Sequence, residues 1–125
     1  MEKIEPSSVE FRGTSYPCCA SLTMGLIGGK WKTVILFHLM HKTLRYSDLR
    51  KSMPTVTERT LSLQLKALES DGLIRRKVYT TKPPLKVEYS LTEFGESLIP
   101  VIQSIVDWGD FVIKSSVNDL RTKTA

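Results

Sequence analysis

The chain has 125 residues, of which 41% are apolar, and it carries a formal net charge of +5. This length fits one compact domain with a single core and leaves no room for a second full domain. No stretch approaches the roughly 18 to 20 continuous apolar residues that cross a bilayer, and residues 1–19 lack the apolar run of a secretory signal. We therefore expect a soluble, cytoplasmic protein with no membrane partner.

The chain has two cysteines, and they are adjacent: Cys18 and Cys19. Such a pair makes neither a disulfide framework nor a four-ligand metal site, which agrees with a reducing compartment. A thiol enzyme would also need a base such as His38 or His41 within hydrogen-bond reach, and a pocket. The two histidines have a spacing that can share a metal ion, but no third ligand lies nearby. We predict no enzyme activity, no catalytic residue, no metal and no cofactor.

The excess positive charge lies in the middle of the chain. Residues 45–86 contain ten basic and four acidic side chains, a net charge of +6, whereas the remainder sums to −1. A charge run is often only a solvated face, but a central segment that holds all the excess resembles the footprint of a polyanion.

Three helices are predicted in the first half of the chain. The first covers residues 18–27 and ends at two glycines, which can adopt the left-handed conformation that closes a helix. The second covers residues 30–41, where apolar residues repeat at helical spacing. The third covers residues 46–53 and ends before Pro54, whose ring disfavours helix at the preceding position.

A fourth helix is predicted after Thr57, which can cap its first turn. Leucines recur along one side of this helix within about 60° of one another, if each residue turns roughly 100°; they are Leu61, Leu65 and Leu68. The opposite side carries Arg59, Ser62, Leu63 and Lys66. One face is therefore predicted to be core and the other to point outward.

The period then changes to that of a β-hairpin. Residues 73–79 and 86–91 are predicted strands joined by a proline-containing loop. Apolar residues alternate along the second strand, so Val87, Tyr89 and Leu91 should face inward.

Thr92 is expected to cap a long final helix, which Pro100 should bend or break. That helix has two apolar stripes and therefore needs two partners, its own domain and most simply the same helix of a second copy, together with the first helix. The alternative is a helix buried inside a monomer. The expected dimer contacts are Leu22, Leu26, Ile102, Ile105, Trp108 and Val112.

Three helices followed by a two-stranded ribbon is the order of a winged helix-turn-helix domain. We predict an α+β, mostly helical fold: a winged helix-turn-helix domain with a two-stranded wing and dimerisation helices at both ends. The expected organisation is a flexible segment over 1–16, the DNA-binding and dimerisation domain over 17–114 and a tail over 115–125. The fourth helix would be the recognition helix in the major groove. Alternatively, its outer face is ordinary helix surface, with Leu63 against a neighbouring chain.

The segments LIGGKWKTVILFHL, LRYSDLRKSMPTVTERTLSLQLKALESDGLIRRKVY and PPLKVEYSLTEFGESLIPVI, followed by Trp108, resemble the HxlR-type, MarR-related winged-helix transcriptional regulators of bacteria. The resemblance implies a homodimeric regulator that binds double-stranded DNA, with the fourth helix in the major groove and the wing beside it. A dimer predicts a pseudo-palindromic operator, and we expect repression. The candidate DNA contacts are Arg45, Thr57, Glu58, Arg59, Ser62, Leu63, Lys66, Arg75, Lys77 and Lys82.

Cys18 is the candidate redox or electrophile sensor. It stands ten residues before Gly28, which matches the position where the family has its cysteine, and several relatives are oxidised or modified there. It also begins a predicted helix, whose positive end favours a thiolate. The alternative is a small apolar residue buried at the dimer contact. A small-molecule effector is not identified by the sequence, and the remaining alternative function is a protein-interaction module that kept the fold without binding DNA.

Overall fold

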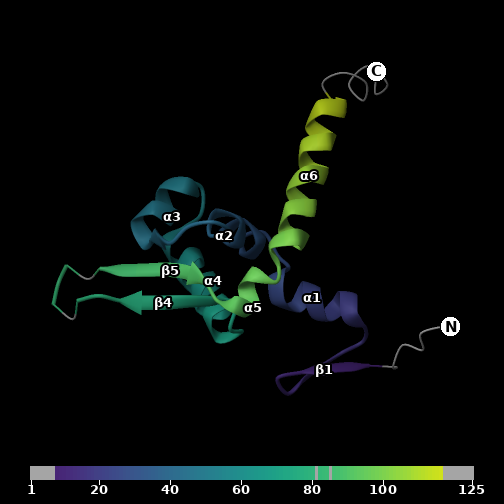
Figure 1. Cartoon of the computed structure of the whole chain (residues 1–125), viewed down its shortest axis with the longest axis horizontal. Coiled ribbons are helices and arrows are strands. Elements are labelled where there is room, and N and C mark those ends of the chain that lie inside the picture. Colours follow the sequence, from purple (N-terminus) through teal and green to yellow (C-terminus); the bar gives the residue numbers. More distant parts are fainter. Residues whose placement is uncertain (1–7, 81, 85, 117–125) are drawn as a thin grey trace.

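The computed structural model describes residues 8–80, 82–84 and 86–116. Its elements, in chain order, are β1 (Val9–Phe11), β2 (Thr14–Tyr16), α1 (Cys19–Ile27), α2 (Lys32–His38), β3 (Leu44–Arg45), α3 (Tyr46–Ser52), α4 (Glu58–Ser70), β4 (Ile74–Val78), β5 (Val87–Leu91), α5 (Glu93–Glu96) and α6 (Ile99–Ser115). Helices α2, α3 and α4 gather beside the long hairpin of β4 and β5, and α6 rises away from this body (Figure 1). The predicted winged helix-turn-helix architecture is confirmed.

The core is apolar and lies between the helices and the inner face of the sheet. The predicted leucine face of α4 belongs to it, because Leu61, Leu65 and Leu68 are each at most 2% exposed. Burial of such side chains contributes about 1.5 to 3 kcal/mol each. The other core residues with almost no exposed surface come from several elements and include Ile27, Ile35, Leu36, Leu49, Leu73, Ile74 and Ile102.

The helix predictions agree with the structure to within one residue for α1 and α3, and Thr57 does cap α4. Helix α2 is shorter than the predicted 30–41. At its start the chain passes through Gly29, whose φ of +90° is accessible to glycine, and the helix begins only at Lys32. At its end Leu39 leaves helical geometry, with ψ near 0°.

The wing is the predicted two-stranded hairpin, extended by a third strand that sequence analysis did not predict. Strand β3 pairs with β5, which pairs in turn with β4, all antiparallel. A strand of two residues is too short to show any periodicity. In β5 the predicted inward residues Tyr89 and Leu91 are buried, and Val87 is half-buried.

The last helix is broken in two, as Pro100 predicted. The Thr92 hydroxyl caps α5 by accepting a hydrogen bond from the backbone N–H of Gly95 at 3.0 Å. The chain leaves helical pairing after Glu96 and resumes as α6, with Pro100 in the first turn, where its missing N–H costs nothing.

The prediction of a flexible segment over 1–16 was wrong for residues 9–16, which form the hairpin of β1 and β2. The two residues of its turn, Arg12 and Gly13, both have positive φ, as a two-residue type I′ turn requires. Three-residue strands carry too little pattern to be recognised, and Phe11 packs on the core only because the fold brings α5 to it. Residues 1–7, and residues 117–125 of the expected tail, lie outside the described part of the chain.

Candidate nucleic-acid interface

Helix α4 is held by its two ends and its leucine face. At its start, the Thr57 hydroxyl accepts a hydrogen bond from the Thr60 N–H at 3.1 Å and donates one to the Thr60 hydroxyl at 2.9 Å. The Arg50 guanidinium of α3 donates to the Val56 carbonyl in the turn between α3 and α4. Thr57 was predicted as a DNA contact, and its hydroxyl is committed to positioning the helix.

The outer face of α4 is open to solvent. Arg59, Ser62 and Lys66 are exposed, and Leu63 is 54% exposed among them. An amphipathic helix whose polar face stands clear of the domain has the width that the major groove of B-DNA admits. Glu58 lies at the first helical position, where its carbonyl accepts a hydrogen bond from the Tyr46 hydroxyl at 3.4 Å.

The basic run of β4 is divided between the two faces of the wing. Opposed residues of an antiparallel pair share a face, and Arg76 opposes the buried Tyr89, whereas Lys77 opposes Glu88. Arg76 therefore lies on the inner face, beside α4. Arg75 and Lys77, both predicted as DNA contacts, lie on the outer face.

A groove of about 480 Å³ separates the recognition helix from the wing. It is lined by Tyr46, Ser62, Leu63, Leu65, Lys66, Glu69, Arg76 and Tyr89. Sequence reasoning omitted Arg76 and Tyr46 from the site. Ile74, Arg76 and Val78 are two residues apart in the strand and therefore share one face. This spacing was the signal that would have placed Arg76 on the inner face with its apolar neighbours.

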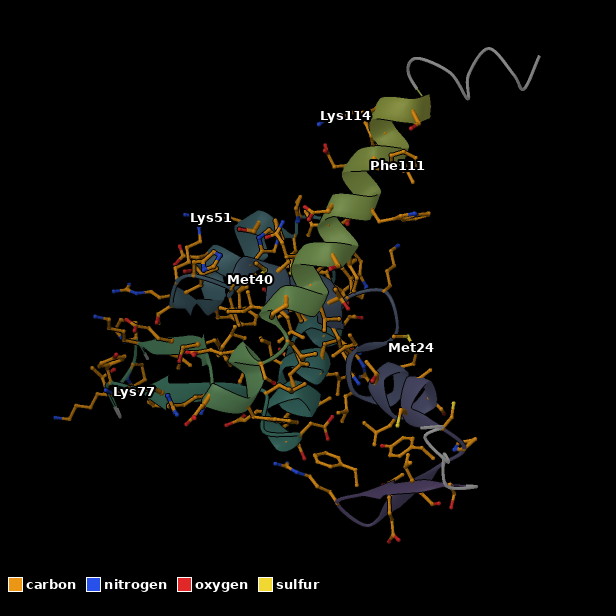
Figure 2. The ribbon with its side chains drawn as sticks, turned by 45° about the vertical axis from the view of Figure 1, so that its right-hand side comes forward. Met24, Met40, Lys51, Lys77, Phe111 and Lys114 are labelled. Carbon is orange, nitrogen blue, oxygen red and sulfur yellow. The ribbon has the colours of Figure 1, made fainter. Side chains whose placement is uncertain are left out.

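The outer face of the wing has its own polar cluster. The ammonium groups of Lys77 and Lys86 lie 4.8 and 5.0 Å from the ring centroid of Tyr79. The Tyr79 hydroxyl donates to Glu88 Oε2 at 3.0 Å, and Lys86 Nζ lies 3.9 Å from Glu88 Oε1. These contacts hold Lys77 against its own strand pair. Figure 2 shows Lys77 on the wing, well away from α6.

Two further predicted contacts lie near the end of the wing. Lys82 is exposed in the loop between the strands. Arg45 is exposed and lines a second hollow of about 360 Å³ together with Pro84 and Lys86.

The predicted dimer residues divide into two groups. Leu26 and Ile102 are 8% and 0% exposed within the protomer, so the structure places them in the core and not on the exposed face of the helices. Trp108 is 68% exposed and Ile105 is 44% exposed, while Leu22 and Val112 are half-buried. The second half of α6 extends beyond the body, and Phe111 lies clear of it near the end of the helix (Figures 1 and 2).

The cysteines and histidines lie away from the outer face of α4. Cys18 and Cys19 are exposed at the start of α1, so Cys18 is not buried within the protomer. His38 and His41 line a hollow of about 370 Å³ beside Gln103 of α6. Burial lowers the pKa of His38 from its ordinary value of 6.5, and the charge of Lys42 lowers it further. Among the residues that the structure describes, no three side chains cluster as metal ligands would.

The fold and this surface define a winged helix-turn-helix protein of the DNA-binding class. The profile of the HxlR-like helix-turn-helix family matches residues 26–117, and the chain belongs to this family of transcriptional regulators. It is 50% identical over 107 residues to YdeP, an uncharacterised HTH-type transcriptional regulator of Bacillus subtilis, covering 86% of this chain and 80% of YdeP. Within the described ranges, no helix has the length and apolar content needed to cross a membrane.

Solved structures of a redox regulator and of a transcriptional regulator are similar to the chain. The oxidised form of the redox regulator HypR is 43% identical with a TM-score of 0.70, over 74% of this chain and 95% of HypR. The reduced form of the transcriptional regulator YodB from B. subtilis is 31% identical with a TM-score of 0.62, over 74% of this chain and 92% of YodB.

Proposed function

We propose that this HxlR-family regulator binds a pseudo-palindromic operator as a homodimer and represses transcription from it. The observation that carries the proposal is the outer face of α4, where Arg59, Ser62, Leu63 and Lys66 stand exposed over a fully buried leucine face. Arginine and lysine recognise guanine, serine bonds to several bases, and an apolar side chain meets the thymine methyl group. Repression follows if the bound dimer excludes polymerase from the promoter.

The homodimer is supported by the apolar surface that α6 leaves uncovered. Val101, Ile105 and Trp108 are 42%, 44% and 68% exposed, and they follow one another at steps of four and three residues. Such a stripe is the seam of a helix that packs on a second helix. A two-fold dimer is the simplest arrangement that covers it, because the same stripe is then buried on both copies.

The experiment is selection of bound fragments from genomic DNA by the purified protein, followed by titration of the selected duplex at several salt concentrations. We expect two inverted half-sites with centres roughly 34 to 36 Å apart, or a multiple of that distance. Affinity should fall steeply with salt, because each neutralised phosphate releases counterions. Sedimentation that shows a monomer on the duplex would contradict the dimer, and weak binding without sequence preference would favour a protein-interaction module.

We also propose that Cys18 makes the regulator responsive to oxidants or electrophiles. The support is its exposure at the start of α1 and the likeness of the chain to HypR, a redox regulator. Adjacent cysteines bridge to each other only with strain, so oxidation would join Cys18 to a second subunit or cap it with a small thiol.

The test uses the neighbouring cysteine as its control. Operator affinity is measured before and after mild diamide treatment of the wild type, Cys18→Ser and Cys19→Ser. Sensing by Cys18 requires that the wild type and Cys19→Ser respond and Cys18→Ser does not. Unchanged affinity in all three proteins would place control elsewhere. As a regulator of genomic DNA the protein is proposed to act in the bacterial cytoplasm and not as an enzyme.

A further inference from the structure

The hairpin of β1 and β2 lies before residue 26, where the match to the family profile begins. It packs on α1 at one side and reaches the far end of α4 at the other. On the α1 side, the Tyr16 ring covers Gly25 so closely that a Cβ there would lie 2.7 Å from Tyr16 Cε1. The hairpin therefore bridges two helices that are separated in sequence by α2 and α3.

The end of α4 leaves one carbonyl without a donor inside the helix. The N–H of Gly72 donates to the Glu69 carbonyl at 3.0 Å, and φ at Gly72 is +76°. The N–H of Leu73 donates to the Leu68 carbonyl, also at 3.0 Å. Together these bonds form a Schellman motif. The Ser70 carbonyl, at the last helical position, is one that helix geometry leaves without a donor inside the helix.

Arg12 supplies that donor from the turn of the hairpin. Its Nη1 donates to the Ser70 carbonyl at 3.0 Å. A cation is favourable there, because the C-terminal end of a helix carries partial negative charge. Gly72 leaves the space that the guanidinium uses, since a Cβ at Gly72 would lie 2.6 Å from Arg12 Nη2. The backbone of Arg12 has a φ of +49°, a conformation that arginine rarely adopts, so the turn places a strained residue where its guanidinium reaches Ser70.

Phe11, the preceding residue, connects the hairpin to α5, the short helix that precedes α6. Its ring stacks on that of Phe94 in α5, with centroids 5.9 Å apart. The Arg12 guanidinium also lies 5.3 Å from the centroid of the Phe11 ring. One turn of the hairpin thus contacts the end of the recognition helix and the element that leads into α6.

We propose that the hairpin is a strap that sets the orientation of α4 relative to α1 and α6, with Arg12 and Phe11 as positioning residues. The inference rests on the proposed dimeric operator binding. In a dimer built on α6, the angle between the body and that helix decides where the two recognition helices lie. The strap therefore determines how strictly the protein requires one spacing between half-sites.

The experiment measures affinity for a series of duplexes in which the half-sites are kept and the spacer is changed by one or two base pairs. For the wild type, a change of one base pair should cost about tenfold or more, because it rotates one half-site by roughly a tenth of a turn. For Arg12→Ala and Phe11→Ala the cost should shrink to about threefold, because the loosened helix follows the displaced site. Base preference within a half-site and the salt dependence should stay as in the wild type.

Two variants serve as controls. Glu10→Ala removes an exposed charge from the same strand and should leave the spacing profile unchanged. Arg12→Lys retains a cationic donor and should recover most of the wild-type profile, which a general loss of stability would not explain. Should Arg12→Ala fail to fold, Phe11→Ala still tests the strap, because it removes the ring contact with Phe94 and leaves the Arg12 hydrogen bond to Ser70 in place.

The outcomes separate the two proposals. A spacing profile as sharp in Arg12→Ala and Phe11→Ala as in the wild type overturns the strap. Equal weakening at every spacing also overturns it, because that result assigns the two residues to stability alone. If the wild type itself shows no dependence on spacing, the dimeric operator fails and the strap falls with it.

Discussion

Helices α4 and α6 are both amphipathic, and they differ in what covers their apolar sides. In α4 the leucine face is closed by the same chain, and the outer face presents Arg59, Ser62 and Lys66 around the exposed Leu63. In α6 Ile102 is fully buried by the body, whereas Ile105 and Trp108 stay exposed. The body covers only the first turns of α6 before the helix leaves it (Figure 1).

From this difference we expect the two helices to have different kinds of partner. An exposed basic face over a satisfied core is stable in water and attracts a polyanion. An exposed apolar stripe is unfavourable in water and is stabilised by another apolar surface. In the proposed dimer, operator binding depends on both helices, α4 for reading DNA and α6 for joining two copies, and each contribution can be broken separately.

The largest effect is expected from a charge placed in the α6 stripe. Trp108→Glu should convert the dimer to a monomer, because the carboxylate would be buried without a partner. Operator affinity should fall by about 30-fold or more, as loss of a tryptophan hot spot costs about 2 kcal/mol or more. Sedimentation and titration of the operator measure the two results. Gln103→Glu adds the same charge on another side of α6 and should leave the dimer intact; a dimeric Trp108→Glu would contradict our assignment.

A substitution in α4 should change base preference and leave the dimer intact. Arg59→Ala should relax the preference at particular operator positions by about 1 to 3 kcal/mol, while Lys82→Ala should weaken binding to all sequences alike and lower the salt slope by about one. Competition assays with single-base operator variants distinguish these results. Equal loss across every sequence would make Arg59 a phosphate contact.

The two faces of the wing provide a matched pair. We expect a DNA phosphate to enter the groove between α4 and the wing, which Arg76 lines. Arg76→Gln should therefore lower the salt slope by about 0.9, the value for one phosphate contact, and Arg75→Gln should leave it unchanged. Titrations between low and high salt measure both slopes. A larger change for Arg75→Gln would mean that the outer face of the wing is the one that contacts DNA.

Thr57 should matter for the stability of α4 more than for recognition. Thr57→Ala removes the acceptor of the Thr60 N–H and should lower the free energy of unfolding by about 1 kcal/mol. Denaturant unfolding measures this change, and Thr57→Ser, which retains the acceptor, is the control. An unchanged stability together with a loss of operator affinity would return Thr57 to the DNA contacts.

The smallest effect concerns His38, which lies near the start of α6. Its pKa is lowered in the folded protein, chiefly by burial, so the unfolded chain binds the proton more readily. The contribution of neutral His38 to the free energy of unfolding is therefore fully present above the ordinary pKa of about 6.5. It is lost as the pH falls toward the lower pKa of the folded protein. Denaturant midpoints measured on both sides of that value should differ less in His38→Gln than in the wild type. Equal differences would show that other groups dominate.

Most of the recognition helix was predictable from the sequence because its determinants are local. Thr57 caps it and three leucines repeat at helical spacing, and Gly72 permits the turn after it, so neighbouring residues decide the element. Pro100 was readable for the same reason, since a missing N–H acts on its own helix. Repeated signals over a dozen residues were enough to define the winged-helix order and the family resemblance.

The tertiary structure decided which surfaces remain free. Ile102 and Ile105 have the same character in the sequence, and only the path of α6 across the body buries one and exposes the other. Arg76 and Arg75 are chemically identical, and the strand register alone places one beside α4. Likewise, the hairpin at residues 9–16 has weak local signals and is held by Ser70 and by Phe94 of α5. The sequence by itself determined elements whose causes lie within a few residues, whereas burial, facing and long-range capping depend on neighbours that only the folded chain brings together.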